Sequence, residues 1–433
     1  MTVTSTSPWA GRALALVGIL LSAFNLRTAV TSLTPLLDSL STTFGFGAAV
    51  TGVFGMVPTA AFALFGVLTP AIAHRLGLER TALLSMVLAA GGLLARAFAT
   101  NTVDLLVSSA VALSGMGIGN VVLPPLVKRY FPTRIGIVST AYITVLQIGT
   151  MLPALAAVPM AQIAGWPVAL GAWSLIAAAA ALVWVGVLAQ ERQRHSVLAR
   201  AHDRAVTSDD EAPELISPQP ELRVARSPLA WGMTFMFGMT SLVTYAMFTW
   251  LPVLMVEAGA DPVFAGNMLA LFAALGLISS LTMPLAAVHL RNPYPLVVVC
   301  LLAYAVAFPG LLLAPMKAPT LWVVLLGLGP TTFPLALTLI NLRTRTPQGS
   351  AALSGFMQGV GYTLSCAGPL LFGILHEVSG GWGLPFAFLS LCVAMMATGA
   401  WFACRPSYLE DDPRVNAAAG SDRAALSDPP TAR

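Results

Sequence analysis

The sequence predicts an all-α membrane protein of twelve transmembrane helices, arranged as two parallel halves of six. Three observations support this fold class: the composition, the spacing of the apolar stretches, and a recurrence of helix-breaking residues at half the chain length. The 433 residues are 57% hydrophobic and only 9% charged, with a mean hydropathy of +0.81. Soluble domains carry about 25% charged residues. Most of this protein's surface is therefore expected to face lipid.

Apolar stretches long enough to cross a bilayer recur along the whole chain. A membrane-spanning helix needs about 20 predominantly apolar residues. The first stretch is interpreted as a retained span, because no basic region precedes Arg12 and no small-residue cleavage site follows the stretch. The predicted spans are residues 13–37, 48–73, 80–99, 104–127, 135–160, 167–189, 228–256, 264–288, 294–314, 320–340, 350–376 and 383–404.

Polar segments separate these spans into domains. The stretch between the sixth and seventh spans holds an acidic cluster (Asp209, Asp210 and Glu211) followed by prolines, which is typical of a solvated linker. The segment after Arg405 is polar and rich in Ala and Pro, which is typical of disorder. The predicted domains are an N-terminal segment 1–12, a six-helix bundle 13–189, a linker 190–226, a second six-helix bundle 227–404 and a disordered tail 405–433.

The basic residues predict how the chain is oriented. Lys and Arg near the ends of spans are retained on the cytoplasmic side. Apart from Lys317, the loop Lys and Arg residues fall on one face, together with both termini and the linker. We therefore expect a multi-pass protein of the cell membrane with both termini in the cytoplasm. The net charge of +4 is spread among short loops, which argues against a nucleic-acid partner.

Helix-breaking residues recur in the same order in both halves. Pro153 is followed by Gly165 and Trp166, and Pro369 is followed at the same spacing by Gly381 and Trp382. Recurrence in the same direction indicates parallel repeats, and we assign Pro153 and Pro369 a structural or gating role. Chance recurrence is the alternative, because Pro and Gly are common in membrane helices.

Three segments carry a family resemblance. Asn25-Leu26-Arg27 with Thr31-Ser32-Leu33-Thr34-Pro35 in the first span, GMGIGNVVLPPLVKRYFP from Gly115, and LSGFMQGVGYTLSCAGP from Leu353 together resemble the cyanate and 2-nitroimidazole transporters of the major facilitator superfamily. The resemblance implies the major facilitator fold and uptake of a small anion or a small nitrogen heterocycle.

The loop between the second and third spans departs from the usual pattern of that superfamily. The pattern has Gly, an acidic residue, a basic residue and Gly, whereas this chain has Pro70, His74, Arg75 and Gly77. Arg75 and Gly77 can still form the tight turn, so we assign them a structural or gating role. The missing Asp puts in doubt the usual charge relay from this loop to span eleven.

Two arginines lie deep in predicted spans, where a charge is costly unless it faces a cavity or a partner. Arg27 lies in the middle to outer half of the first span, and no Asp or Glu occupies a corresponding depth in any span. An arginine without a buried carboxylate favours an anionic or strongly dipolar substrate. The alternative for Arg27 is a structural contact between helices. For Arg96 in the third span, packing or a domain contact is favoured over substrate binding.

Neutral polar residues at compatible depths complete the candidate substrate site. Gln358 and Tyr362 are four residues apart, so both side chains lie on one helical face. Gln147 lies on the fifth span with Tyr142. The alternative role for each neutral residue is a hydrogen bond between helices. The candidate substrate-binding residues are Arg27, Asn25, Asn120, Gln147, Tyr245, Gln358 and Tyr362.

We expect a monomeric transporter that works by alternating access, with the bilayer and a small-molecule substrate as its partners and with no cofactor and no metal. Neither the four cysteines nor the histidines have metal-ligand spacing, and no nucleotide-binding loop is present, so an enzyme is disfavoured. A proton-coupled symporter, an exchanger and a uniporter remain open. An efflux antiporter for lipophilic cations is the alternative within the class, although it would need an intramembrane carboxylate. A non-transporting membrane receptor is the alternative outside the class.

Overall fold

The computed structural model describes residues 12–202 and 223–415, and all the regular structure in these ranges is helical. Twelve helical stretches in these ranges, several of them made of more than one helix, are long and apolar enough to span a membrane, which confirms the predicted fold class. A lipid-exposed backbone must satisfy its own hydrogen bonds, and for a single apolar segment only a helix does so.

Six spans form the first half of the chain. Span one is broken into α1 (Ala13–Asn25), α2 (Thr28–Thr31), the 3-10 turn η1 (Thr34–Leu36) and α3 (Leu37–Phe44). The next five spans are α4 (Ala48–Leu76), α5 (Leu78–Arg96), α6 (Thr102–Tyr130), α7 (Ile135–Ala164), and α8 (Trp166–Gly171) with α9 (Ser174–His202).

Six further spans form the second half. They are α10 (Pro228–Glu257), α11 (Pro262–His289), α12 (Tyr294–Leu313), α13 (Pro319–Leu328) with the 3-10 turn η3 (Gly329–Thr331) and α14 (Thr332–Leu342), α15 (Pro347–Ser365) with α16 (Ala367–Ser379), and α17 (Gly383–Cys404). Short 3-10 turns precede and follow this half, η2 (Val224–Arg226) and η4 (Leu409–Asp411).

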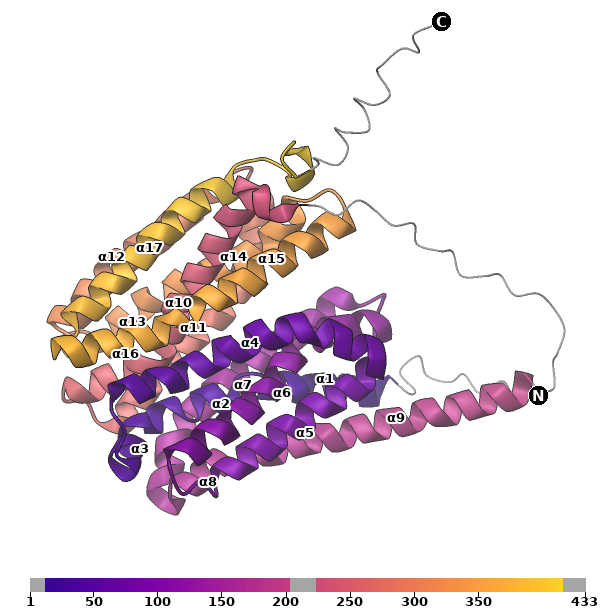
Figure 1. Cartoon of the computed structure of the whole chain (residues 1–433), viewed down its shortest axis with the longest axis horizontal. Helices are drawn as coiled ribbons and strands as arrows, with labels where there is room; N and C mark the ends of the chain where they lie inside the picture. Colours follow the sequence, from indigo (N-terminus) through magenta and orange to yellow (C-terminus); the bar gives the residue numbers. More distant parts are fainter. Residues whose placement is uncertain (1–11, 203–222, 416–433) are drawn as a thin grey trace, which may run out of the picture.

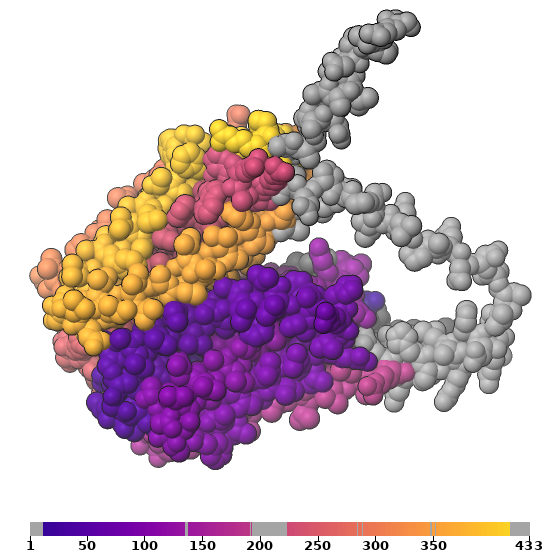
Figure 2. All heavy atoms as spheres, in the orientation of Figure 1, coloured from indigo at the N-terminus to yellow at the C-terminus, as the bar shows by residue number. Residues whose placement is uncertain are grey.

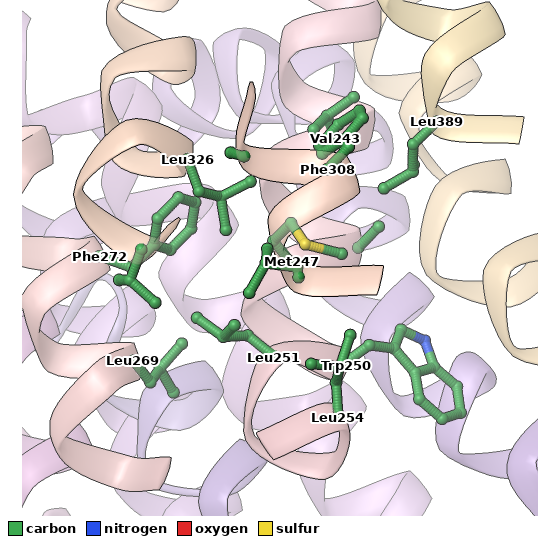
Figure 3. Packing of buried hydrophobic residues seen from close by; sticks show 14 of the residues in the cluster. Val243, Met247, Trp250, Leu251, Leu254, Leu269, Phe272, Phe308, Leu326 and Leu389 are labelled. Atoms are coloured by element: carbon green, nitrogen blue, oxygen red, sulfur yellow. The ribbon is translucent and has the colours of Figure 1, made fainter. Parts of the chain in front are cut away.

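The second half is built around α10. This helix packs against α15, α16 and α17, and its apolar side chains are buried along most of its length. Figure 3 shows how Met247 and Leu251 of α10 meet side chains from neighbouring helices, among them Phe272, Phe308 and Leu326. Because lipid is as apolar as these side chains, close van der Waals packing rather than water exclusion holds such helices together.

The two halves touch at one end and separate at the other (Figures 1 and 2). We call the end where α9 finishes and α10 begins the linker end, and the end where α3 and α16 lie the closed end. Contacts between the halves join α4 to α15 and α16, and α7 to α11. At the closed end, a Cβ atom added to Gly52 of α4 would lie 2.8 Å from the carbonyl oxygen of Pro369. Glycine thus allows the two backbones to meet directly.

The repeated residues lie near corresponding turns of the two halves but not at identical positions. Pro153 lies in the middle of the continuous helix α7, whereas Pro369 lies in the first turn of α16. The glycine with a positive φ is Gly165 (85°) in the first half and, in the second, Gly380 (64°), one residue before the repeated Gly381. Trp166 then starts α8, and Trp382 directly precedes α17.

The structure differs from the sequence expectation at the two polar segments. Helix α9 continues to His202, into the predicted linker 190–226. Residues 405–415 of the predicted disordered tail are folded, since Leu409 and Val415 are buried in one apolar cluster with Val224. Burial of these few apolar side chains stabilises a folded structure although the composition of the segment is mostly polar. The rest of the predicted tail, residues 416–433, and the N-terminal residues 1–11 lie outside the described residues.

Candidate functional site

A cavity of about 1180 Å³ lies between the two halves. It is lined by the break between α1 and α2 and by α4, α6 and α7 from the first half, and by α10, α11, α13, η3, α14 and α15 from the second. On α4 the lining runs from Phe62 to Pro70, which is the part of the helix nearer the linker end. On α15 it runs from Ser354 to Tyr362, again on the linker side of span eleven. The cavity therefore reaches from the middle of the bundle toward the linker end.

A polar vestibule of about 630 Å³ adjoins this cavity and shares Leu337, Asn341 and Ser354 with it. Lys128 of α6 and Arg345, in the loop after α14, add two positive side chains to its walls. Arg345 is ion-paired with Asp411 at 2.8 Å, so its charge is partly balanced there.

A break in span one places Arg27 in the cavity wall. Helix α1 ends at Asn25, and Arg27 has φ −131° and ψ −6°, outside the helical range. The side chains of Thr28 and Thr31 donate to the carbonyl oxygens of Asn25 and Arg27 at 3.1 and 3.2 Å. The Arg27 carbonyl also accepts from the backbone N–H of Thr31 at 3.2 Å, so the two hydroxyl groups add side-chain hydrogen bonds on either side of the break.

The guanidinium of Arg27 lies among aromatic rings. Its Cζ atom is 4.6 Å from the ring centroid of Phe62 on α4. It interacts electrostatically with the phenols of Tyr245 and Tyr362 from the second half, and by a side-chain hydrogen bond with Tyr362. Its Nη1 atom also donates to the carbonyl oxygen of Leu26 at 3.3 Å. No acidic side chain is found among the described residues that line the cavity. The charge is held by a ring face, a hydroxyl and a carbonyl group.

Six of the seven candidate binding residues line this one cavity. Gln147 donates from Nε2 to the carbonyl oxygen of Ala273 at 3.4 Å, which links α7 to α11 across the halves. Gln358 donates to Ser354 Oγ at 2.8 Å. The six are Arg27, Asn120, Gln147, Tyr245, Gln358 and Tyr362.

Asn25 is the exception, because it lies outside the cavity lining. It is fully buried, and its Nδ2 atom donates to the carbonyl oxygen of Leu21 at 2.9 Å. The break after Asn25 gives Arg27 a direction that a continuous helix would not, so a helical projection of span one misplaces the residues around it.

Several lining residues were not singled out from the sequence. Phe62 carried no signal, because one phenylalanine in an apolar span is indistinguishable from a lipid-facing one. Thr244, Ser279 and Asn341 also line the cavity. These three residues could have been predicted from the sequence, because each is a polar residue deep within an apolar span.

Arg96 is placed away from the cavity. It is fully buried, its Nε donates to Ser109 Oγ at 2.9 Å, and its Nη1 donates to the carbonyl oxygen of Ala29 at 2.7 Å. Ser109 belongs to α6 and Ala29 to α2, so Arg96 joins three spans.

The turn between α4 and α5 contains Arg75 and Gly77. Arg75 is exposed, and Gly77 has φ 84°, a conformation that glycine adopts at little cost. The acidic group near this turn is Glu79, which is buried and accepts from Arg129 Nη1 at 3.2 Å and from the Tyr130 hydroxyl at 3.0 Å. Glu79 therefore ties the start of α5 to the end of α6.

Comparison with known proteins agrees with this architecture. The model of the Major Facilitator Superfamily matches residues 19–367. The 2-nitroimidazole transporter of Escherichia coli is 31% identical over 92% of this chain and 97% of its own length. The cyanate transport protein of the same organism is 28% identical over 87% of this chain and 94% of its own length.

A solved structure has the same fold. The crystal structure of a bacterial homolog to the human lysosomal transporter Spinster superposes with a TM-score of 0.65, at 15% identity, over 98% of each chain. The family match covers well over half of the sequence, and the relatives align over nearly their full length. This chain, a multi-pass membrane transporter and not an enzyme, belongs to the major facilitator superfamily.

Proposed function

We propose that this protein carries a small anion or a small nitrogen heterocycle across the cell membrane, and that Arg27 contacts the substrate. The observation that carries the proposal is a guanidinium in a membrane cavity with no carboxylate among the described lining residues. Burial of an unpaired charge is costly, and a bound anion would balance it. The 2-nitroimidazole and cyanate transporters named above carry solutes of these two kinds.

The surroundings of Arg27 suit a small planar solute. The rings of Phe62 and Tyr362 flank the guanidinium, while its remaining N–H groups form a fork that matches two acceptor atoms of one ligand. The hydroxyl and amide groups of Tyr245, Gln147 and Gln358 come from both halves of the protein. A substrate in the cavity can therefore touch both halves at once, which alternating access requires.

We further propose that the linker end faces the cytoplasm, so that the cavity described here opens inward. The basic residues Arg75, Lys128, Arg129 and Arg345 lie at this end, in agreement with the retention of positive charge on the cytoplasmic side. We propose a monomer as the transporting unit. A proton-coupled symporter, an exchanger and a uniporter remain the candidate modes.

Flux into proteoliposomes tests the proposal. The panel contains cyanate, 2-nitroimidazole, 4-hydroxybenzoate and a lipophilic cation, each measured with and without a pH gradient. Loss of a charge-assisted hydrogen bond costs about 1.5–3 kcal/mol, so Arg27→Gln is expected to lower the uptake efficiency of an anion by tenfold or more. Arg27→Lys keeps the charge but loses the forked arrangement of N–H donors. Its uptake efficiency is expected to lie between those of the wild type and Arg27→Gln.

The matched control is Arg291→Gln, which removes a positive charge from an exposed loop position. It is expected to transport like the wild type. Extrusion of the lipophilic cation together with a harmless Arg27→Gln would replace this proposal by the efflux alternative. A flux that follows the pH gradient would identify proton symport, and an insensitive flux would favour uniport or exchange.

A further inference from the structure

Arg96 contacts α2, the short helix that begins directly after Arg27. In a regular α-helix the N–H of Leu33 would bond to the carbonyl of Ala29, four residues earlier. Here the N–H of Leu33 bonds instead to the carbonyl of Val30 at 3.1 Å. The carbonyl of Ala29 is thereby released from the helix, and Arg96 Nη1 donates to it at 2.7 Å. Arg96 thus supplies the hydrogen bond that the irregular backbone has lost.

The donor is held firmly on neighbouring spans. Arg96 is the last residue of α5 and has no exposed surface. Its Nε atom donates to Ser109 Oγ at 2.9 Å, and that hydroxyl donates to the carbonyl of Leu105 on α6 at 2.6 Å. The guanidinium is therefore fixed relative to α5 and α6, and its Nη1 atom is aimed at the Ala29 carbonyl of α2, while its Nη2 atom is buried without a hydrogen-bond partner among the described residues.

We propose that Arg96 is a positioning residue for Arg27. Its bond to Ala29 fixes the short helix α2, which begins directly after Arg27, to α5 and α6. The break between α1 and α2 directs the Arg27 guanidinium into the cavity. Without this anchor, residues 26–28 can return to regular helix, which would carry the φ angle of Arg27 from −131° toward about −63° and turn its side chain away from Phe62. The functional part of the inference rests on the proposed role of Arg27.

Thiol labelling tests the positioning without any knowledge of the substrate. In a chain whose four native cysteines are replaced by alanine, Arg27→Cys and Ser354→Cys each place one thiol in the cavity wall, on opposite halves. Each is combined with Arg96→Met, an apolar side chain of similar length, and with Arg96→Lys, which can still donate one bond. The full-length protein is labelled in proteoliposomes with N-ethylmaleimide.

At position 27, the labelling rate is expected to fall tenfold or more in Arg96→Met and less than threefold in Arg96→Lys. At position 354, the labelling rate is expected to stay unchanged in both. A purely structural role would slow both thiols alike or neither, and either outcome would overturn the inference. If Arg96→Met does not fold, Ser109→Ala supplies the test. It removes the Nε partner while the charge remains, and it is expected to slow position 27 but not position 354.

Transport then separates this inference from the proposed function. With cyanate and 2-nitroimidazole as probes, Arg96→Met is expected to raise the KM tenfold in the wild type and to have no further effect in Arg27→Gln. Additive losses would show that Arg96 does not act through Arg27, even if Arg27 binds substrate. If Arg27→Gln left transport unchanged, the proposed role of Arg27 in substrate binding would be refuted. The labelling rates would still decide whether Arg96 sets the direction of the side chain at position 27.

Discussion

Arg27 balances its charge with a ring face, a hydroxyl group and a backbone carbonyl rather than with a carboxylate. These groups lower the cost of an intramembrane charge, but no acidic side chain among the described residues of the cavity wall balances it. A cation over an aromatic ring gains about 0.5–2 kcal/mol. The remaining imbalance keeps the guanidinium available to a ligand.

Phe62 is expected to contribute to substrate affinity by holding the Arg27 guanidinium in place, with its Cζ atom 4.6 Å from the ring centroid. Phe62→Leu keeps an apolar side chain but removes the ring face, and a loss of about 1 kcal/mol corresponds to a roughly fivefold rise in KM for an anionic probe. Initial uptake rates measure it. The control is Phe98→Leu, because Phe98 is 74% exposed on the outside of the bundle. Equal KM values in the two variants would contradict the assigned role of the ring.

At the residue scale, sequence reasoning located polar groups of the cavity wall but not apolar ones; their role in substrate binding stays a prediction. An arginine, glutamine or tyrosine inside an apolar span attracts notice because burying it is costly, and six such candidates do line the cavity. Phe62 could not be recognised, since phenylalanine is equally suited to lipid and to a cavity wall. Asn25 was included because it is polar and deep in span one. Residue type alone did not indicate that its side chain bonds within α1, to the Leu21 carbonyl, rather than facing the cavity.

The helices of the two halves meet through small residues at the closed end. Gly52 and Gly55 of α4 lie against Pro369 of α16, and a Cβ at Gly373 would approach the carbonyl of Ala48 to 2.8 Å. Backbone contact of this kind leaves no room for side chains, so the seal depends on glycine at these positions.

Gly52→Val is expected to prevent the closed end from sealing. Its side chain would begin 2.8 Å from the Pro369 oxygen and 2.9 Å from Leu370 Cα, both of them backbone atoms that cannot move independently. We expect at least a tenfold lower maximal flux, measured in proteoliposomes, because the cavity can no longer stay closed on that side. Gly91→Val is the control, since a Cβ there meets nothing within 4 Å. Similar fluxes for both variants would show that the contact is dispensable.

A tail segment holds the start of span eleven. Glu410 accepts hydrogen bonds from the backbone N–H groups of Arg345 and Thr346, both at 3.0 Å, and from the Thr346 hydroxyl at 2.9 Å. Partial burial raises the pKa of Glu410, but these hydrogen bonds outweigh it and the net pKa is lowered. The carboxylate is thus the form that the folded tail stabilises.

The lowered pKa of Glu410 predicts a pH dependence with a definite sign. The stabilising contribution is present above the unfolded-state pKa of about 4.3 and is lost as the pH falls through the lower folded-state value. We expect Glu410→Gln to speed amide hydrogen exchange at Arg345 and Thr346 at pH 7, and the difference from wild type to vanish at strongly acid pH. Asp411→Asn should have a smaller effect, because its ion pair with Arg345 is exposed on both sides. A difference that persists in acid would contradict this account.

At the element scale, the apolar length of each span was readable from sequence, but the interruptions were not. Hydropathy averages over about 19 residues. A break of two residues between α1 and α2, or the 3-10 turn at Gly329–Thr331, disappears in that average. The folded structure of segment 405–415 could not be predicted from composition, because two buried side chains are too few to change the composition of a polar stretch.

The molecule as a whole combines two similar halves around one cavity, open at the linker end and sealed at the other. The recurrence of Pro153 and Pro369 indicated two parallel halves, and the arrangement of basic residues indicated which ends share a side. Neither pattern could indicate which end is open. Both states of an alternating carrier are encoded by the same residues and differ by only a few kcal/mol.

The uncompensated charge of Arg27 has a kinetic consequence for the complete transport cycle. Under the proposed transport of an anion, an empty carrier takes the Arg27 guanidinium without a bound anion through the state in which both ends are shut, whereas a loaded carrier takes a neutral pair. The return of the unoccupied protein should then limit the cycle. We expect trans-stimulation: unlabelled solute on the far side should accelerate uptake of labelled solute about tenfold in counterflow measurements, and Arg27→Gln should abolish the acceleration. Equal rates of counterflow and net uptake would mean that the vacant protein reorients as freely as the occupied one.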